Sequence, residues 1–179
     1  GDHMAIVDTP GVDSTDGAHR AATESALHLA DVVCYVTDYN HVLADVNFRF
    51  LRSLAEWGKP TYVIVNQIDK HRESEVPFHQ FRKGICEAFA EWGIAPAGLL
   101  FLSLRQPDHP YSQWEELLSI LQRLQPIRSE LSIRAVDRSA RFLADSYRAT
   151  LHARNQEERE RLLAVLGEED EMAAIETLA

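Results

Sequence analysis

Two short loops in this chain carry carboxylate and amide side chains at the ends of apolar runs. Asp8-Thr9-Pro10-Gly11 follows the run at residues 5–7, and Asn66-Gln67-Ile68-Asp69 follows the run at residues 61–65. In the first loop, a carboxylate can hold a water on Mg²⁺, and the glycine N–H can approach a terminal phosphate because no Cβ stands in the way. A turn of this composition is also ordinary loop chemistry when it stands alone.

The second loop offers a means of choosing between bases. The carboxylate of Asp69 can accept two hydrogen bonds from the edge of guanine, whereas adenine lacks that pair of donors and would leave the carboxylate unpaired. Asn66 would tie the loop to neighbouring backbone. Asn and Asp after a strand also often cap the next helix. The two loops occur in order, with one strand-helix unit between them, and together they favour a guanine-nucleotide site.

These loops need a scaffold, and the surrounding sequence predicts one. Runs rich in β-formers and without polar alternation are typical of strands buried on both faces; they lie at residues 5–7, 31–37, 61–65 and 99–103. Apolar stripes at helical spacing lie between or after them, at residues 46–57, 78–92 and 114–124. This alternation predicts an α/β fold with a parallel sheet, right-handed crossovers and helices on both faces.

The composition changes after Pro126. Residues 127–166 contain no Gly or Pro, and arginines and glutamates alternate with apolar residues. This pattern predicts a long amphipathic helix or a helix pair that needs a partner surface. We expect Gly167 and the acidic residues 168–171 to interrupt it, and we interpret residues 1–4 as a cloning remnant.

Bulk composition narrows the classes of function. The 179 residues are 45% hydrophobic and 26% charged, enough for one α/β domain with an appendage. A net charge of -10 argues against a nucleic-acid surface and against docking on anionic lipid. No apolar run reaches the roughly 20 residues of a membrane span, so we expect a cytoplasmic protein. Cys34 and Cys86 are expected to be buried reduced thiols, and the scattered histidines predict no structural metal.

At the level of motifs, the sequence resembles bacterial dynamin-like GTPases. The Asp8–Gly11 loop resembles the third GTPase motif, DxxG, and the Asn66–Asp69 loop resembles the fourth, N/T-K-x-D. Ser103-Leu104-Arg105 is similar to the fifth motif, whose backbone contacts the guanine carbonyl. The resemblance covers residues 5–71 at the level of sequence, and the helical region after Pro126 fits the bundle that follows the GTPase domain in that family.

The resemblance implies a partial P-loop GTPase-type parallel sheet with flanking helices, followed by a long helical segment. Residues 5–125 would be the C-terminal part of a GTPase domain, and residues 126–179 a helical bundle or neck. The intact parent would bind GTP, GDP and Mg²⁺, hydrolyse GTP, self-associate and remodel membrane, as a cytoplasmic protein that meets the membrane through parts absent here. The nucleotide-binding residues implied are Asp8, Thr9, Pro10, Gly11, Asn66, Gln67, Asp69, Ser103 and Leu104.

Three departures from the family pattern concern the chemistry. Gln67 replaces the usual lysine, whose aliphatic stem packs over the purine. Val12 stands where Ras-like GTPases carry a water-orienting glutamine, so no catalytic side chain is expected in this chain. The phosphate-loop pattern G-x-x-x-x-G-K-[ST] is absent from the 179 residues. We therefore expect Asp8 to hold Mg²⁺ through water only in the intact parent, and this chain alone to bind nucleotide weakly with negligible hydrolysis.

Several alternatives stay open at this point. The chain could be a non-catalytic interaction scaffold derived from a GTPase fold. A GTPase of the translation or ribosome-assembly type shares the motifs but predicts a basic surface. Residues 12–29 would be the second switch and its helix, either a nucleotide-sensing dimer surface or a solvated helix. Without the strand that feeds the phosphate loop, the segment at residues 5–7 would pair directly with the strand at 31–37, leave the sheet, or join a second chain.

Overall fold

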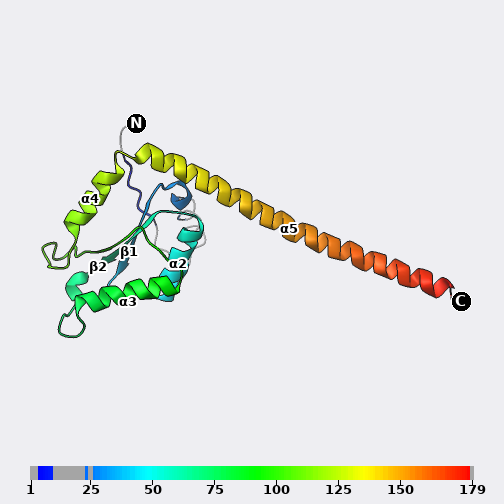
Figure 1. The fold of residues 1–179 in the computed structure, drawn as a ribbon, viewed down its shortest axis with the longest axis horizontal. Helices are drawn as coiled ribbons and strands as arrows, with labels where there is room; N and C mark the ends of the chain where they lie inside the picture. The colour runs from blue at the N-terminus through cyan, green and yellow to red at the C-terminus, as the bar shows by residue number, and fades with distance from the viewer. Residues whose placement is uncertain (1–3, 10–22, 24–25, 178–179) are drawn as a thin grey trace. The chain divides into compact units, whose positions relative to one another are not determined.

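The structure is a computed structural model that describes residues 4–9, 23 and 26–177, with side chains described through Val165. Two compact units make up the chain, Gly1–Ser139 and Ala140–Ala179, and each is described by itself. The first unit holds the sheet and its helices, and the second is the continuation of the last helix (Figure 1).

A three-stranded parallel sheet forms the centre of the first unit. Its strands β1 (Val33–Asp38), β2 (Thr61–Asn66) and β3 (Gly98–Phe101) lie in the order β1-β2-β3. Figure 1 labels β1 and β2. The strands are connected through α2 (Asp45–Glu56) and α3 (Phe78–Glu91), and α4 (Trp114–Leu124) follows β3. The predicted parallel α/β fold is confirmed, because three of the four expected strands and all three expected helices are present.

Two apolar clusters hold the helices on the sheet. The larger one contains Val63 and Val65 of β2 together with Leu54 of α2 and Phe89 of α3. The second cluster, on Ile64 and the neighbouring residues of β3, is covered by α4. Because successive side chains of β2 enter different clusters, this strand is buried on both faces, as its unbroken apolar run predicts.

The edge strand β1 differs from that expectation. Its side chains alternate between buried and exposed, and Val36 is 58% exposed. The prediction of buried thiols is also wrong, since Cys34 and Cys86 are both free and exposed. Cys34 lies on the face of β1 opposite to buried Tyr35, and the cluster under α4 contains residues from β2, β3 and α4 together with Leu102, but none from β1. An unbroken apolar run therefore does not ensure burial at the edge of a sheet.

The strand predicted at residues 5–7 does not form. Residues 4–9 have no regular secondary structure, and the side chains of Ile6 and Val7 are 82% and 70% exposed. Direct pairing with the strand at 31–37, one of the three alternatives for this segment, is therefore wrong, and within this chain the segment lies outside the sheet. A three-residue strand is stable only where a neighbouring strand pairs with it, and the described residues supply none here. Of the predicted switch segment, only Thr23 and the helical residues 26–29 are described; the rest lies outside the described residues.

One continuous helix, α5 (Arg128–Thr177), follows the sheet domain. The open choice between one helix and a pair is therefore resolved in favour of one. The expected interruption at Gly167 is wrong, because a single glycine costs a helix only about 1 kcal/mol and does not break it. Within the first unit, Ala135 is 6% exposed, and Ser132 Oγ donates a hydrogen bond to Asp31 Oδ2 at 2.7 Å.

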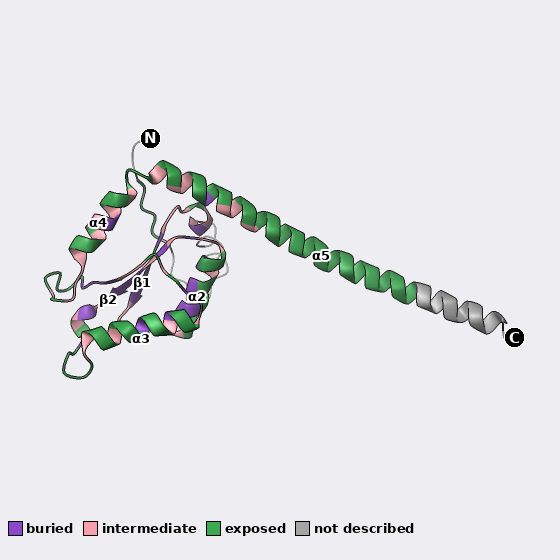
Figure 2. Ribbon diagram, viewed as in Figure 1, coloured by how far each residue is buried: buried purple, intermediate pink, exposed green. Residues whose placement is uncertain are grey.

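The second unit is the remainder of this helix. From Ala140 to Val165, every side chain is exposed except that of half-buried Phe142 (Figure 2). Its apolar members include Leu143 at 64% and Tyr147 at 67% exposure. Across the described part of the chain, none of the helices combines the length and the hydropathy that a membrane span requires.

Candidate functional site

The candidate site lies where the parallel strands end. In the sheet register, Asp38 is opposite Asn66, and Val65 is opposite Phe101, so the carboxyl ends of all three strands meet at one edge. Parallel α/β sheets bind ligands beyond this edge. The loops that follow β2 and β3, which contain the predicted residues from Gln67 to Leu104, therefore border this edge.

Asn66 fastens those two loops to each other. Its Oδ1 accepts a hydrogen bond from the Gln67 N–H at 2.8 Å and a longer one from the Leu104 N–H at 3.4 Å. The backbone adds a second connection, since the Ile68 N–H donates to the carbonyl of Leu102 at 3.0 Å. The predicted role of Asn66, to tie the loop to neighbouring backbone, matches these contacts.

Asp69 lies in the short 3₁₀ helix η1 (Ile68–Lys70), and its side chain contacts a residue of the loop after β3. The hydroxyl of Ser103, which is fully buried, donates to Asp69 Oδ1 at 2.6 Å. This hydrogen bond, with smaller contributions from a backbone hydrogen bond and from nearby Arg105, holds the pKa of the Asp69 carboxyl below its ordinary value. Asp69 is therefore an ionised, oriented acceptor at neutral pH, which is what recognition of a guanine edge requires.

Ser103 is itself fixed from several directions. Its Oγ accepts a hydrogen bond from the Gln106 N–H at 2.8 Å, and its own N–H donates to Ser112 Oγ at 3.2 Å. Its carbonyl accepts from the indole N–H of Trp114 at 3.2 Å. Because all of its polar groups are engaged, Ser103 is a rigid support for Asp69.

Gln67 stands where the fourth GTPase motif has a lysine, and its own backbone conformation is unusual. Its φ is 66°, in the left-handed region that residues other than glycine adopt rarely. Its Oε1 is buried and has no hydrogen-bond partner among the described residues. Strained backbone and unsatisfied polar atoms each cost free energy, and they collect at ligand sites.

The phosphate-side residues are not brought into this arrangement. Asp8 is exposed and Thr9 half-buried, both without regular structure, and among the described residues no hydrogen bond or ion pair joins them to the loop of Asn66. Pro10 and Gly11 lie outside the described residues. The Mg²⁺ role of Asp8 stays a prediction.

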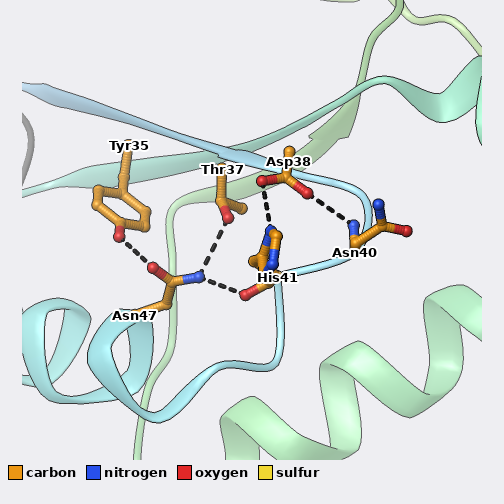
Figure 3. A network of polar contacts seen from close by, with 6 residues as sticks. All are labelled: Tyr35, Thr37, Asp38, Asn40, His41 and Asn47. Atoms are coloured by element: carbon orange, nitrogen blue, oxygen red, sulfur yellow. Dashed lines mark hydrogen bonds and ion pairs between the residues drawn. The ribbon is translucent and has the colours of Figure 1, made fainter. Parts of the chain in front are cut away.

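A further polar network at the same edge was missed by sequence reasoning (Figure 3). The side chain of Asn47, on α2, accepts from the Tyr35 hydroxyl at 2.5 Å and donates to Thr37 Oγ1 at 3.1 Å. Beyond it, the Asp38 carboxylate accepts from the Asn40 N–H and from His41 Nδ1, and the bond to His41 lowers the pKa of Asp38. Asp38 is the last residue of β1, at the edge where site residues were predicted, so the same rule could have found it.

Comparisons with known proteins found one family model and several relatives. The dynamin family model matches residues 1–69, which end at the Asp69 loop. Dynamin-like protein A of Bacillus subtilis is 44% identical over 122 residues, which cover 68% of this chain and 10% of that protein. GTPase Der of Limosilactobacillus reuteri is 25% identical over 103 residues, covering 55% of this chain and 24% of that protein.

GTPase Der of Brucella anthropi is 28% identical over 96 residues, or 49% of this chain and 20% of that protein. No solved structure is significantly similar to the chain. The chain thus spans a tenth to a quarter of the length of these curated relatives. The family match, the similarity to the Bacillus protein and the parallel sheet lead to one assignment. The chain belongs to the dynamin family, and it is similar to a bacterial dynamin-like protein.

Proposed function

We propose that this chain supplies guanine recognition to a GTP-binding and GTP-hydrolysing domain that acts with Mg²⁺. The observation that carries the proposal is the ionised carboxylate of Asp69, oriented by the buried hydroxyl of Ser103 where two strand-end loops meet. Guanine presents two adjacent donors to such a carboxylate, and adenine does not. In the proposed site, the Leu104 backbone faces the guanine carbonyl and the stem of Gln67 covers the purine.

In this proposal, the phosphates and Mg²⁺ are bound by the other half of the site. Asp8, Thr9, Pro10 and Gly11 would meet the terminal phosphate, with Asp8 holding Mg²⁺ through a water. These groups need the glycine-rich lysine loop, which the 179 residues do not contain. Alone, the chain is therefore expected to bind guanine nucleotides weakly and to hydrolyse GTP negligibly.

A change of base preference tests the guanine assignment. Asp69→Asn replaces an acceptor by an amide that can donate to the 2-carbonyl of xanthine, so preference should move from GDP to XDP. We expect the ratio of the two dissociation constants to reverse by at least about tenfold. Glu87→Gln, an exposed change on α3, serves as the matched control. Equal affinity of the unaltered chain for GDP, XDP and ADP, measured by NMR titration, would refute the proposal.

Self-association belongs to the same proposal. Among the described residues, β1 pairs only with β2, which places it at an edge of the sheet, and Val36 on this strand is 58% exposed. We propose that chains associate through this edge and that the intact parent self-associates as well. Val36→Lys should reduce association, because a charge at a strand edge opposes pairing. A monomer at all concentrations in analytical ultracentrifugation of the unaltered chain would contradict this.

The wider role is proposed from the family. We propose that residues 5–125 are the C-terminal part of the GTPase domain, that residues 126–179 are a neck or bundle segment, and that the cytoplasmic parent remodels membranes. The net charge of -10 supports a membrane contact made elsewhere in the parent and no nucleic-acid partner. Vesicle co-sedimentation of this chain and of the full-length protein tests that division of roles. Binding of the isolated chain to anionic vesicles would contradict it.

A further inference from the structure

His71 is a buried polar residue next to the candidate base site. It directly follows η1, two positions after Asp69, and its side chain is 0% exposed. Four aromatic rings surround the imidazole, with centroid distances between 5.4 and 5.8 Å; they belong to Tyr39, Phe78, Phe81 and Tyr111. A phenylalanine would fill such an aromatic enclosure without the cost of burying two ring nitrogens, so packing alone does not account for a histidine.

Both ring nitrogens face polar groups from elsewhere in the chain. The hydroxyl of Tyr39, in the loop after β1, lies 3.1 Å from Nδ1. Nε2 has no hydrogen-bond partner among the described residues, and Oε2 of Glu73 lies 3.4 Å from it. A ring with a proton on Nε2 and none on Nδ1 fits both contacts, because Tyr39 then donates to Nδ1 and the Nε2–H faces a carboxylate.

Glu73 continues this connection to the loop after β3. Its Oε2 accepts hydrogen bonds from the hydroxyl of Tyr111 at 2.8 Å and from the Phe78 N–H at 3.0 Å. Tyr111 directly precedes Ser112, whose Oγ accepts from the Ser103 N–H at 3.2 Å. A displacement of Tyr111 is therefore transmitted within one residue to the serine that orients Asp69.

We propose that His71 is a positioning residue for guanine recognition, because it links the loops after β1, β2 and β3 through Tyr39, Glu73 and Tyr111. We call this series of contacts, from Tyr39 through His71 and Glu73 to Tyr111, the His71 relay. The inference rests on the proposed function, since the relay matters to a ligand only if Asp69 binds the base. The relay sets the relative position of Asp69 and Ser103, and through Tyr39 it makes that position sensitive to the loop that follows β1.

Phenylalanine substitutions separate this role from packing. His71→Phe keeps an aromatic ring in the enclosure and removes both nitrogens, and Tyr39→Phe and Tyr111→Phe each remove one hydroxyl of the relay. Tyr62→Phe, on β2 and outside the relay, is the matched control. Three quantities are measured on the 179-residue chain: thermal stability, affinity for GDP, and the indole N–H resonance of Trp114. That indole donates to the Ser103 carbonyl, so its resonance reports the position of the loop without any ligand.

We expect His71→Phe to unfold within a few degrees of the unaltered chain, to bind GDP about fivefold more weakly and to shift the Trp114 resonance. In a double-mutant cycle, Tyr39→Phe should add little once His71 is phenylalanine, because both act through one contact. Tyr62→Phe should change neither the affinity nor the resonance. Unchanged affinity and resonance in His71→Phe would overturn the inference while leaving the proposed function intact.

Two other outcomes are also decisive. If the unaltered chain fails to bind GDP, the proposed function fails, and the Trp114 resonance alone then decides the inference. A shift of this resonance in His71→Phe and Tyr111→Phe supports the relay. The absence of a shift in both variants refutes it. If His71→Phe does not fold, Tyr39→Phe and Tyr111→Phe test the two ends of the relay. Independent, additive effects of these two changes on the resonance would refute a connection through His71.

Discussion

The two halves of the proposed nucleotide site differ in how much of their structure lies within this chain. Around Asp69, each functional group is fixed by neighbours from the loops after β2 and β3. Around Asp8, the backbone is irregular and the preceding side chains of Ile6 and Val7 are exposed. The sequences of the two loops are equally suggestive, but only one of them is part of an assembled structure.

The contrast shows what each half requires. The guanine-side loops are connections of one compact unit, in which β2 and β3 are paired and their helices share the core with them. The phosphate-side loop would follow a strand that needs a neighbour to satisfy its backbone. The proposed base site can therefore be assembled in a chain in which the proposed phosphate site is not.

The largest expected effect is on the stability of the guanine side. Phe101, at the end of β3, is 1% exposed and contacts the rings of Phe78 and Phe81. Phe101→Ala should cost about 3–5 kcal/mol of unfolding free energy because it leaves a cavity under both loops. Ile6→Ala, on the phosphate side, should change stability by less than about 0.5 kcal/mol. Urea denaturation of both variants measures the difference, and equal losses would contradict the contrast.

A smaller effect is expected on the electrostatics of Asp69. Ser103→Ala removes the hydrogen bond that contributes most to the lowered pKa, so the pKa of Asp69 should rise toward its ordinary value. Because the folded-state pKa lies below the unfolded value, ionised Asp69 stabilises the fold above about pH 4, and this stabilisation is lost as the pH falls through the folded-state pKa.

In Ser103→Ala that loss should begin at a higher pH, and guanine affinity should disappear at a higher pH as well. Carboxyl ¹³C NMR titration of the two proteins gives both pKa values directly. Ser53→Ala, on α2, is the matched control, since its hydroxyl donates to the Arg49 carbonyl within that helix. A pKa of Asp69 that is the same with and without the Ser103 hydroxyl would show that another group orients the carboxylate.

A modest gain is expected from restoring the family's lysine. Gln67→Lys removes a buried amide oxygen that has no partner among the described residues and supplies a longer aliphatic stem to cover the purine. We expect guanine nucleotides to bind about threefold more tightly, with little change for adenine nucleotides. NMR titration with GDP and ADP measures this, and a loss of GDP affinity would indicate that the glutamine itself contacts the base.

The smallest effect is expected at Asp8. Asp8→Asn should leave stability and GDP affinity of this chain unchanged, because the side chain is exposed in an irregular segment. The same substitution in the intact parent should abolish Mg²⁺-dependent hydrolysis if Asp8 holds the metal water there. A weakened GDP affinity in the 179-residue chain would show that the phosphate side is assembled after all.

Local patterns predicted the parts of the fold that depend on near neighbours. The runs that became β1, β2 and β3 and the stripes that became α2, α3 and α4 were recognised because their periodicity reflects burial in one unit. Asn66, Asp69 and Ser103 were predicted to belong to one site because residues at the ends of parallel strands converge at one edge of the sheet. That rule is a consequence of topology and does not depend on side-chain detail.

Predictions failed where the outcome depended on non-local partners. The strand at residues 5–7 had the right composition, but no neighbouring strand pairs with it among the described residues. Cys34 lies in an apolar run, but on the face of an edge strand that α4 does not cover. The buried roles of His71 and Asn47 could not be foreseen, since their partners Glu73 and Tyr35 are identified only by the fold.

The central claim is that base recognition is complete in this chain and phosphate recognition is not. Its most direct test is the affinity of the 179-residue chain for GMP, GTP and AMP in the presence of Mg²⁺. The account predicts that GMP and GTP bind within about threefold of each other and that AMP binds at least about tenfold more weakly than GMP. It would be contradicted by GTP binding about a hundredfold more tightly than GMP, or by equal affinity for GMP and AMP.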